Sequence, residues 1–169
     1  WHRQSREIVG GYRLGPTDAI LAARGVEGLY TSTLFRFDER FLNLMGPALE
    51  VGRSFVRLEF QRDYHPLLLL WKGIGAFVTR YPRYRILFGP VSVSARYRME
   101  SRQLMVEFLQ ANNCAHHLSH LVHPRRPFWG QALTPWEVRA ALAGLRGIRA
   151  LWEMISTMER DRKGLPILM

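Results

Sequence analysis

Two short segments place charged side chains among residues typical of buried strands. Arg13 lies in the segment GYRLGPT, and Glu50, Arg53 and Ser54 lie in the segment LEVGRSFV. A charge in a buried strand is costly unless it is paired, so we expect Glu50 to form an ion pair with Arg13 or Arg53. A paired carboxylate beside an arginine can accept a proton in general base chemistry, or it can only fix the sheet. The residues alone leave both readings open.

The geometry of a strand limits which of these side chains can meet. Successive side chains point to opposite faces, so Glu50 and Gly52 share a face, and Arg53 lies on the other. A bulge at Gly52 would re-aim Arg53. The simplest interpretation of Ser54 is a packed strand serine.

Other chemistries lack their signatures in this sequence. It contains no phosphate-binding loop, dinucleotide fingerprint, zincin motif, nucleophile elbow or HxxxxD acyltransferase motif. His116 and His120 would share a helix face, but no Asp or Glu lies between Glu107 and Glu137 to complete a metal site, so we expect no metal. The single cysteine, Cys114, is expected to be a packed thiol and excludes an internal disulfide.

The elements that position the charged residues are predicted from hydrophobic periodicity. Strands are expected at 7–14, 29–37, 49–60 and 85–93, the last interrupted by Gly89-Pro90, where the ladder should open. Helices are expected from Asp38 to Leu44, from Pro66 to before Pro82, over 101–110 and from Thr134 onward, the last divided by Gly144 and Gly147. This order predicts a mixed α/β (α+β) domain.

Six blocks in order match a known family. The blocks GGYRLGPT, LYTSTLFRFD, LEVGRSFVRLEFQ, PLLLLWKGIGAFV, YRILFGPVSVS and SRQLMVEFL closely resemble the hemolysin-like N-acyltransferases of the acetyltransferase (GNAT) superfamily. This group includes the ornithine- and glycine-lipid N-acyltransferases, and it is distantly similar to the acyl-homoserine-lactone synthases. The resemblance covers about residues 7 to 128. It implies a mixed central sheet with two splayed central strands, flanked by helices, in a core of residues 1–130, with a helical extension at 131–169.

The resemblance also implies a reaction and roles for residues. A (3-hydroxy)fatty acyl group would pass from the phosphopantetheine thioester of acyl carrier protein to the amine of an amino acid, with no permanently bound cofactor. Glu50, facing an open groove, would accept the proton, and Arg13 and Arg53 would hold Glu50 and the substrate carboxylate. Ser54 would protonate or orient the departing thiolate. The expected acyl-binding residues are Leu34, Phe55, Trp71 and Phe88.

A departure from the superfamily pattern favours the carrier protein as donor. Residues 61–66 read QRDYHP and lack the glycines that let backbone amides approach a pyrophosphate, which argues against coenzyme A. Acyl carrier protein is acidic, whereas this chain has a net charge of +10. The expected docking residues are Arg62, Arg80, Arg83 and Arg85.

The composition sets the remaining expectations. Charge alone also fits nucleic acid or anionic lipid, but no groove-reading helix is predicted, so we expect no nucleic-acid partner. The longest apolar run, Leu67 to Trp71, is far too short to span a bilayer, so we expect a cytoplasmic protein that could contact the inner face of the membrane. Parts of the family pattern are missing from this sequence, so we expect a fragment that is weakly active or inactive alone. In many relatives the domain is joined to a glycerolipid acyltransferase. The alternative function is a non-catalytic module that docks acyl carrier protein for such a partner.

Overall fold

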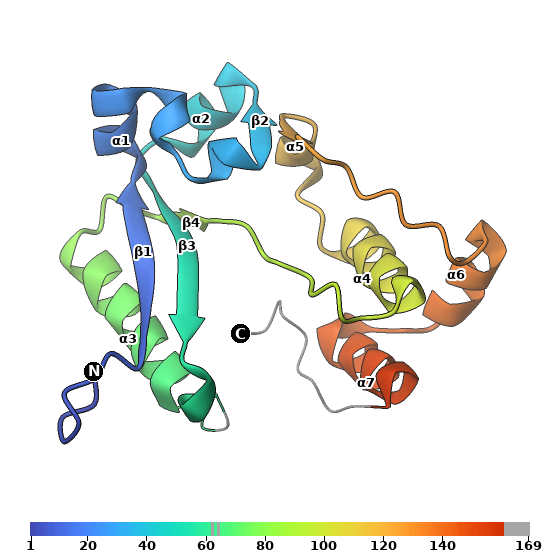
Figure 1. The fold of residues 1–169 in the computed structure, drawn as a ribbon. Helices are drawn as coiled ribbons and strands as arrows, with labels where there is room; N and C mark the ends of the chain where they lie inside the picture. Colours follow the sequence, from blue (N-terminus) through green and yellow to red (C-terminus); the bar gives the residue numbers. More distant parts are fainter. Residues whose placement is uncertain (62, 64, 161–169) are drawn as a thin grey trace. The chain divides into compact units, whose positions relative to one another are not determined.

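The computed structural model describes residues 1–61, 63 and 65–160 (Figure 1). The chain divides into two compact units. The first comprises Trp1–Pro90 and Leu121–Arg125, and the second comprises Val91–His120 and the chain from Arg126 onward. The boundaries of these units differ from the expected segments 1–130 and 131–169.

The first unit mixes strands and helices, which confirms the expected α/β class. Its elements are β1 (Gly10–Pro16), α1 (Thr17–Arg24), two 3₁₀ turns (Val26–Gly28 and Thr31–Thr33), β2 (Phe35–Phe37), α2 (Glu39–Met45), β3 (Ala48–Val56), a 3₁₀ turn (Leu58–Phe60), α3 (His65–Arg80), β4 (Ile86–Phe88) and β5 (Val122–Pro124).

The central sheet has the strand order β1-β3-β4. β1 runs antiparallel to β3 along most of its length, whereas β4 pairs in parallel only with the first three residues of β3, Ala48–Glu50. Beyond Glu50 and its partner Phe88 the two strands have no further ladder pairing. Figure 1 shows β3 extending well past the short β4. The expected splay of two central strands is therefore present.

Gly89 marks the point where β4 leaves the ladder. A Cβ atom built at Gly89 would lie 1.9 Å from the Val51 carbonyl oxygen, so no side chain fits at this position. Pro90 follows and offers no N–H to continue the ladder. The sequence signal at Gly89-Pro90 thus has a local steric cause.

A bulge interrupts β3 next to Gly52, as expected. Gly11 faces Phe55 and Arg13 faces Gly52, so one residue of β1, Tyr12, lies opposite two residues of β3, Arg53 and Ser54. Arg53 takes up the extra length with φ of 51°, a left-handed conformation that is uncommon for a residue with a side chain.

Three strands of the first unit are shorter than predicted, and two elements were not predicted. Only Phe35–Phe37 of the predicted strand 29–37 and Ile86–Phe88 of the predicted strand 85–93 are extended, and the predicted strand 49–60 ends at Val56. The unpredicted elements are helix α1, which carries Asp18 in its first turn and Arg24 in its last, and strand β5, which pairs with β2.

The second unit is helical. It contains α4 (Met99–Asn112), α5 (His116–Ser119), α6 (Pro135–Leu142) and α7 (Gly147–Glu159). Thr134 and Glu137 form the predicted capping box at the start of α6, and Gly144 and Gly147 separate α6 from α7. The buried core of this unit comprises Tyr97, Leu104, Met105, Phe108, Val138, Leu151 and Ile155.

The close approach at Gly89 gives a first prediction. We expect Gly89→Ala to lower the free energy of unfolding by about 2 kcal/mol or more, because the new methyl group would collide with backbone rather than with a movable side chain. Urea denaturation would measure the change. The matched control is Gly75→Ala in α3, where a Cβ meets nothing within 4 Å and alanine favours the helix. Equal stability of the two variants would contradict the steric account.

Candidate active site

The carboxylate of Glu50 lies at the centre of a buried hydrogen-bond network. Its Oε1 accepts hydrogen bonds from the Thr31 N–H at 2.7 Å and from the Thr31 hydroxyl at 2.6 Å. Its Oε2 accepts a hydrogen bond from the Tyr30 N–H at 3.0 Å and a charge-assisted one from the guanidinium of Arg13. Four donors from three residues thus saturate both oxygens.

This network explains why residues 29–34 do not form the predicted strand. Tyrosine and threonine favour strands, but the N–H groups of Tyr30 and Thr31 point at a carboxylate and cannot join a ladder. The segment turns instead as a 3₁₀ helix over Thr31–Thr33. A buried charge on β3 therefore overrides the local strand preference of another segment.

The network keeps Glu50 ionised. Burial raises the pKa of the Glu50 carboxyl, but the hydrogen bonds from Thr31, Arg13 and Tyr30 together outweigh burial and hold this pKa below its ordinary value. A carboxylate with a lowered pKa and no vacant acceptor site is a poor proton acceptor.

The expectation that Glu50 faces an open groove is wrong. Its side chain is 0% exposed, whereas that of Arg13 is 35% exposed. Of the two predicted partners, Arg13 binds Glu50. The structural role of this ion pair is therefore established by geometry, and the role of Glu50 in proton transfer stays a prediction.

Arg53 occupies a different place from Arg13. Its guanidinium carbon lies 5.2 Å from the centre of the Tyr30 ring, in a cation–π arrangement, and it forms no ion pair within the described part of the chain. Arg53 and the neighbouring Ser54 are both exposed. The bulge thus leaves a free, always charged guanidinium beside the segment that Glu50 anchors.

A small cavity lies where β3 and β4 part. Its volume is about 190 Å³, and its lining consists of Thr31, Phe35, Phe37, Phe41, Phe88, Gly89 and Val122. Thr31 connects the cavity to the network, because its hydroxyl binds Glu50. The cavity is lined mainly by apolar side chains, and Thr31 separates it from the carboxylate of Glu50.

Of the four predicted acyl-binding residues, one lines this cavity. Phe88 lines the cavity, whereas Leu34, Phe55 and Trp71 are exposed and do not line it. Three other phenylalanines were missed. Phe35 and Phe37 alternate along β2, and Phe41 stacks on Phe37 at 5.2 Å between ring centres. The alternating phenylalanines of FRF followed by Phe41 were a usable signal, but the pairing of β2 with β5 was not visible in the sequence.

The predicted carrier-docking residues differ in whether their guanidinium groups form an ion pair. Arg80 and Arg85 are exposed and have no ion pair in the described part of the chain. Arg83 is exposed too, but it binds Asp18 at 3.1 Å. Arg62 lies outside the described residues.

The start of α3 is occupied by an acidic side chain. Asp63 accepts a hydrogen bond from the His65 N–H at 2.9 Å and contacts the His65 ring nitrogen at 2.8 Å. Free N–H groups at a helix start are what a phosphate would use. The carboxylate of Asp63 therefore competes with a phosphate at this helix start.

Residues 1–61, 63 and 65–160 contain neither a metal-binding cluster nor a membrane-spanning helix. No three His, Cys, Asp or Glu side chains gather there as a set able to hold a metal ion. No helix in the same ranges is long and apolar enough to cross a bilayer.

Comparisons with known proteins match the region that contains this site. Residues 1–72 match the family model of the acetyltransferase (GNAT) domain. A glycine N(alpha)-acyltransferase of Bacteroides thetaiotaomicron is 35% identical over 118 residues, which are 65% of this chain and 35% of that protein. A glycine N(alpha)-acyltransferase of Phocaeicola vulgatus is 33% identical over 117 residues, which are 64% of this chain and 36% of that protein. The chain thus spans about a third of the length of these curated relatives. No solved structure matches it.

The buried network gives a second prediction. We expect Glu50→Gln to lower the free energy of unfolding by about 3 kcal/mol at pH 7, because the amide leaves Arg13 without its counter-charge. Because folding lowers the pKa of Glu50, its stabilisation is present above the ordinary glutamate pKa and is lost as pH falls through the folded value. The gap between variant and parent should therefore narrow in acid. Thermal unfolding between pH 7 and pH 3 measures it.

The control for this prediction is Glu27→Gln, which changes an exposed glutamate of the same unit. We expect little effect from it at any pH. A Glu50→Gln variant as stable as this control at pH 7 would contradict a structural ion pair.

Proposed function

We propose that this chain contributes to an N-acyltransferase that moves a fatty acyl group from the phosphopantetheine thioester of acyl carrier protein to the amine of an amino acid of the glycine or ornithine type. The match to the GNAT domain and the names of the relatives support acyl transfer to nitrogen. The names of the relatives favour glycine as the acceptor. In this proposal the product serves aminolipid synthesis.

The observation that carries the proposal is that the pairing of β3 with β4 ends at Glu50 and Phe88, and that an apolar cavity lies beside this end of β4. Past Glu50, β3 has no partner in β4, and an extended ligand with amide groups could pair with its free backbone edge. The cavity beside Phe88 and Gly89 would take the acyl carbon end of the thioester. At about 190 Å³ it holds a short part of a ligand rather than a whole lipid chain.

The carrier protein is favoured as donor by charge and by the start of α3. Asp63 would repel the phosphates of coenzyme A there, whereas a carrier protein keeps its own phosphate near its surface. The exposed guanidinium groups of Arg80 and Arg85 are available to an acidic partner. We propose Arg80, Arg83 and Arg85 as the docking residues, with Arg62 beside them in sequence.

Positioning supplies most of the rate in this proposal. The amine nitrogen attacks the thioester carbonyl carbon, the C–N bond forms and the C–S bond breaks, and the proton lost from nitrogen ends on the thiolate sulfur. An α-amine with a pKa near 8 is about one tenth neutral at pH 7, so a strong base is unnecessary. Glu50 acts as a positioning residue that fixes Tyr30 and Thr31, and Arg53 binds the substrate carboxylate. In this proposal Ser54, which is exposed beside Arg53, orients the departing thiolate.

The donor preference gives a third prediction. The intact protein that contains this chain, incubated with 3-hydroxyacyl carrier protein and glycine, ornithine or another single amino acid, should yield an N-acyl amino acid detected by mass spectrometry. Acyl-coenzyme A of the same chain length should give at least about tenfold less product, because the carrier surface and the start of α3 both favour the carrier. Equal use of the two donors would contradict the proposed donor.

Binding of acyl carrier protein without any N-acyl product would instead favour the alternative, a docking module for a joined acyltransferase. The saturated state of Glu50 is the observation that keeps this alternative open, because a purely structural ion pair needs no reaction.

The role of Arg53 gives a fourth prediction. Arg53→Gln should raise the KM for the amino acid about tenfold with little change in stability, because the side chain is exposed and has no ion pair in the described part of the chain. Steady-state kinetics and a thermal melt would measure both effects. Arg36→Gln, an exposed arginine of β2, is the matched control. An unchanged KM in Arg53→Gln would remove Arg53 from the acceptor site.

A further inference from the structure

Helix α3 packs one of its faces against the rest of the first unit. Leu70, Ile74 and Phe77 follow one another at helical spacing and are buried or half-buried. Gly73 lies beside them, and a Cβ atom built there would come within 2.5 Å of the Tyr12 hydroxyl on β1. Figure 1 shows α3 running alongside β1. These residues form the inward face, which holds the helix against the sheet.

A second set of apolar side chains lies on the outward face of α3, which comprises Leu68, Leu69, Trp71 and Lys72. All four side chains are exposed, Leu69 by 64%. Leu68 and Leu69 each lie about one helical turn from Lys72, so the three share one side of the helix. A Cβ atom built at Gly75 would meet nothing within 4 Å, so the described chain leaves this side open. Large apolar groups that gather on an exposed face mark an interaction site.

The charge on this helix has one sign. No Asp or Glu occurs in α3 between His65 and Arg80. Lys72 forms no ion pair with the other residues that the structure describes. The acid that precedes the helix, Asp63, accepts a hydrogen bond from the His65 N–H. On a chain with a net charge of +10, a cationic helix face without acids is complementary to an anionic surface.

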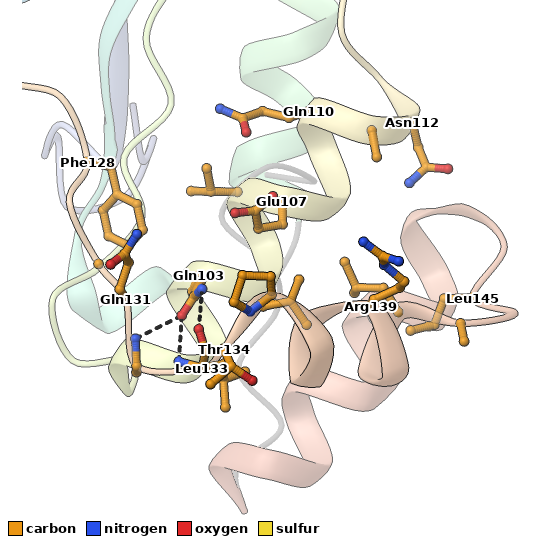
Figure 2. A pocket seen from close by; sticks show the side chains of 18 of the residues that line it. Gln103, Glu107, Gln110, Asn112, Phe128, Gln131, Leu133, Thr134, Arg139 and Leu145 are labelled. Carbon is orange, nitrogen blue, oxygen red and sulfur yellow. Dashed lines mark hydrogen bonds between the residues drawn. The ribbon is translucent and has the colours of Figure 1, made fainter.

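The shape of the outward face favours a bilayer over a folded protein. Its side chains line neither the cavity beside β4 nor the groove that α4, α6 and residues 128–134 form within the second unit (Figure 2). Leu58, in the 3₁₀ turn that precedes α3, is 80% exposed and adds a further apolar group. Protein interfaces concentrate binding in packed pockets. A bilayer accepts protruding leucines singly, tryptophan at the level of the head groups and lysine beside the lipid phosphates.

We propose that the outward face of α3 binds the surface of a bilayer that contains anionic phospholipid. Leu68 and Leu69 insert below the head groups, Trp71 lies at their level, and Lys72 binds lipid phosphate. The helix lies along the surface and does not cross the bilayer. This inference gives a definite face to a membrane contact that the composition only allowed, and it does not depend on the proposed reaction.

The membrane surface and the proposed carrier-docking residues occupy different ends of α3. Arg80 ends the helix, eight residues after Lys72, which corresponds to about 12 Å along the axis. Arg83 and Arg85 follow beyond that end. A bilayer bound at the start of the helix therefore leaves the docking residues to the carrier protein.

Co-flotation of the chain with lipid vesicles tests this surface. One set of vesicles consists of phosphatidylcholine, and in the other phosphatidylglycerol replaces about a third of it. We expect at least about fivefold stronger binding to the anionic vesicles, because one cation near such a surface contributes about 1 kcal/mol. Added salt should reduce this difference. No acyl donor or acceptor is present, so failure of acyl transfer and failure of this surface are separate results.

Two variants with matched controls assign the contact to α3. Leu69→Ser should weaken binding to the anionic vesicles about tenfold, whereas Leu44→Ser on α2, where the leucine is 65% exposed, should not. Lys72→Gln should weaken binding to the anionic vesicles about fivefold and leave binding to phosphatidylcholine unchanged. Arg24→Gln, an exposed arginine of α1, is its control. Thermal melts of the four variants show that each is folded, since all four side chains are exposed.

A tryptophan of the second unit tests the location. Trp136 is 74% exposed and follows the segment that Gln103 on α4 holds by hydrogen bonds from Ala132 and Leu133, both at 2.9 Å (Figure 2). Trp136→Ala should leave vesicle binding unchanged. The proposal is overturned by absent vesicle binding, by equal effects of Leu69→Ser and its control, or by a loss of binding confined to Trp136→Ala.

Acyl carrier protein in place of vesicles separates a bilayer from an acidic protein as the occupant. Unchanged carrier binding in Leu69→Ser, together with weakened vesicle binding, supports the bilayer. A Leu69→Ser variant that loses carrier binding and keeps vesicle binding would assign the outward face to the carrier protein and overturn the proposal.

Discussion

The buried carboxylate of Glu50 is the constraint on which the first unit depends. An ionised group with no exposed surface must be matched by donors, and Arg13, Tyr30 and Thr31 supply all of them. Meeting that requirement draws β1, β3 and the 3₁₀ turn after Leu29 together. It also places the hydroxyl-bearing wall of the apolar cavity, because the same Thr31 faces both the carboxylate and the cavity.

The chemistry that this arrangement favours is positioning rather than proton abstraction. Glu50 is held ionised by its donors, and the free charge at the surface is that of Arg53, which the bulge in β3 sets over Tyr30. The short β4 leaves the far half of β3 without a ladder partner on that side among the residues that the structure describes. In the proposed function, this edge, the cavity and the guanidinium bind an extended thioester donor and a carboxylate-bearing acceptor together.

Sequence reasoning reached the parts of the fold that depend on local signals. Asp38 caps α2, Thr134 and Glu137 cap α6, and Gly89-Pro90 ends β4, because each effect acts within a few residues. It also expected an ion pair of Glu50 with Arg13 or Arg53, since a strand charge needs a partner, and the structure shows that the partner is Arg13. It failed where a distant group decided the outcome: the carboxylate of Glu50 turned residues 30–33 out of a strand, and β5 formed by pairing with β2. The exposure of Leu34, Phe55 and Trp71 likewise depends on how the elements pack, which local signals do not show.

The most direct test of this account is the titration of Glu50 itself. The side-chain carboxyl ¹³C shift, assigned by comparison with Glu50→Gln and followed by NMR against pH, reports the protonation of that one group. The account predicts a midpoint below the ordinary glutamate value of about 4.3, as donor hydrogen bonds require. A midpoint near neutral pH, where a catalytic base titrates, would contradict the positioning role and restore Glu50 as the proton acceptor.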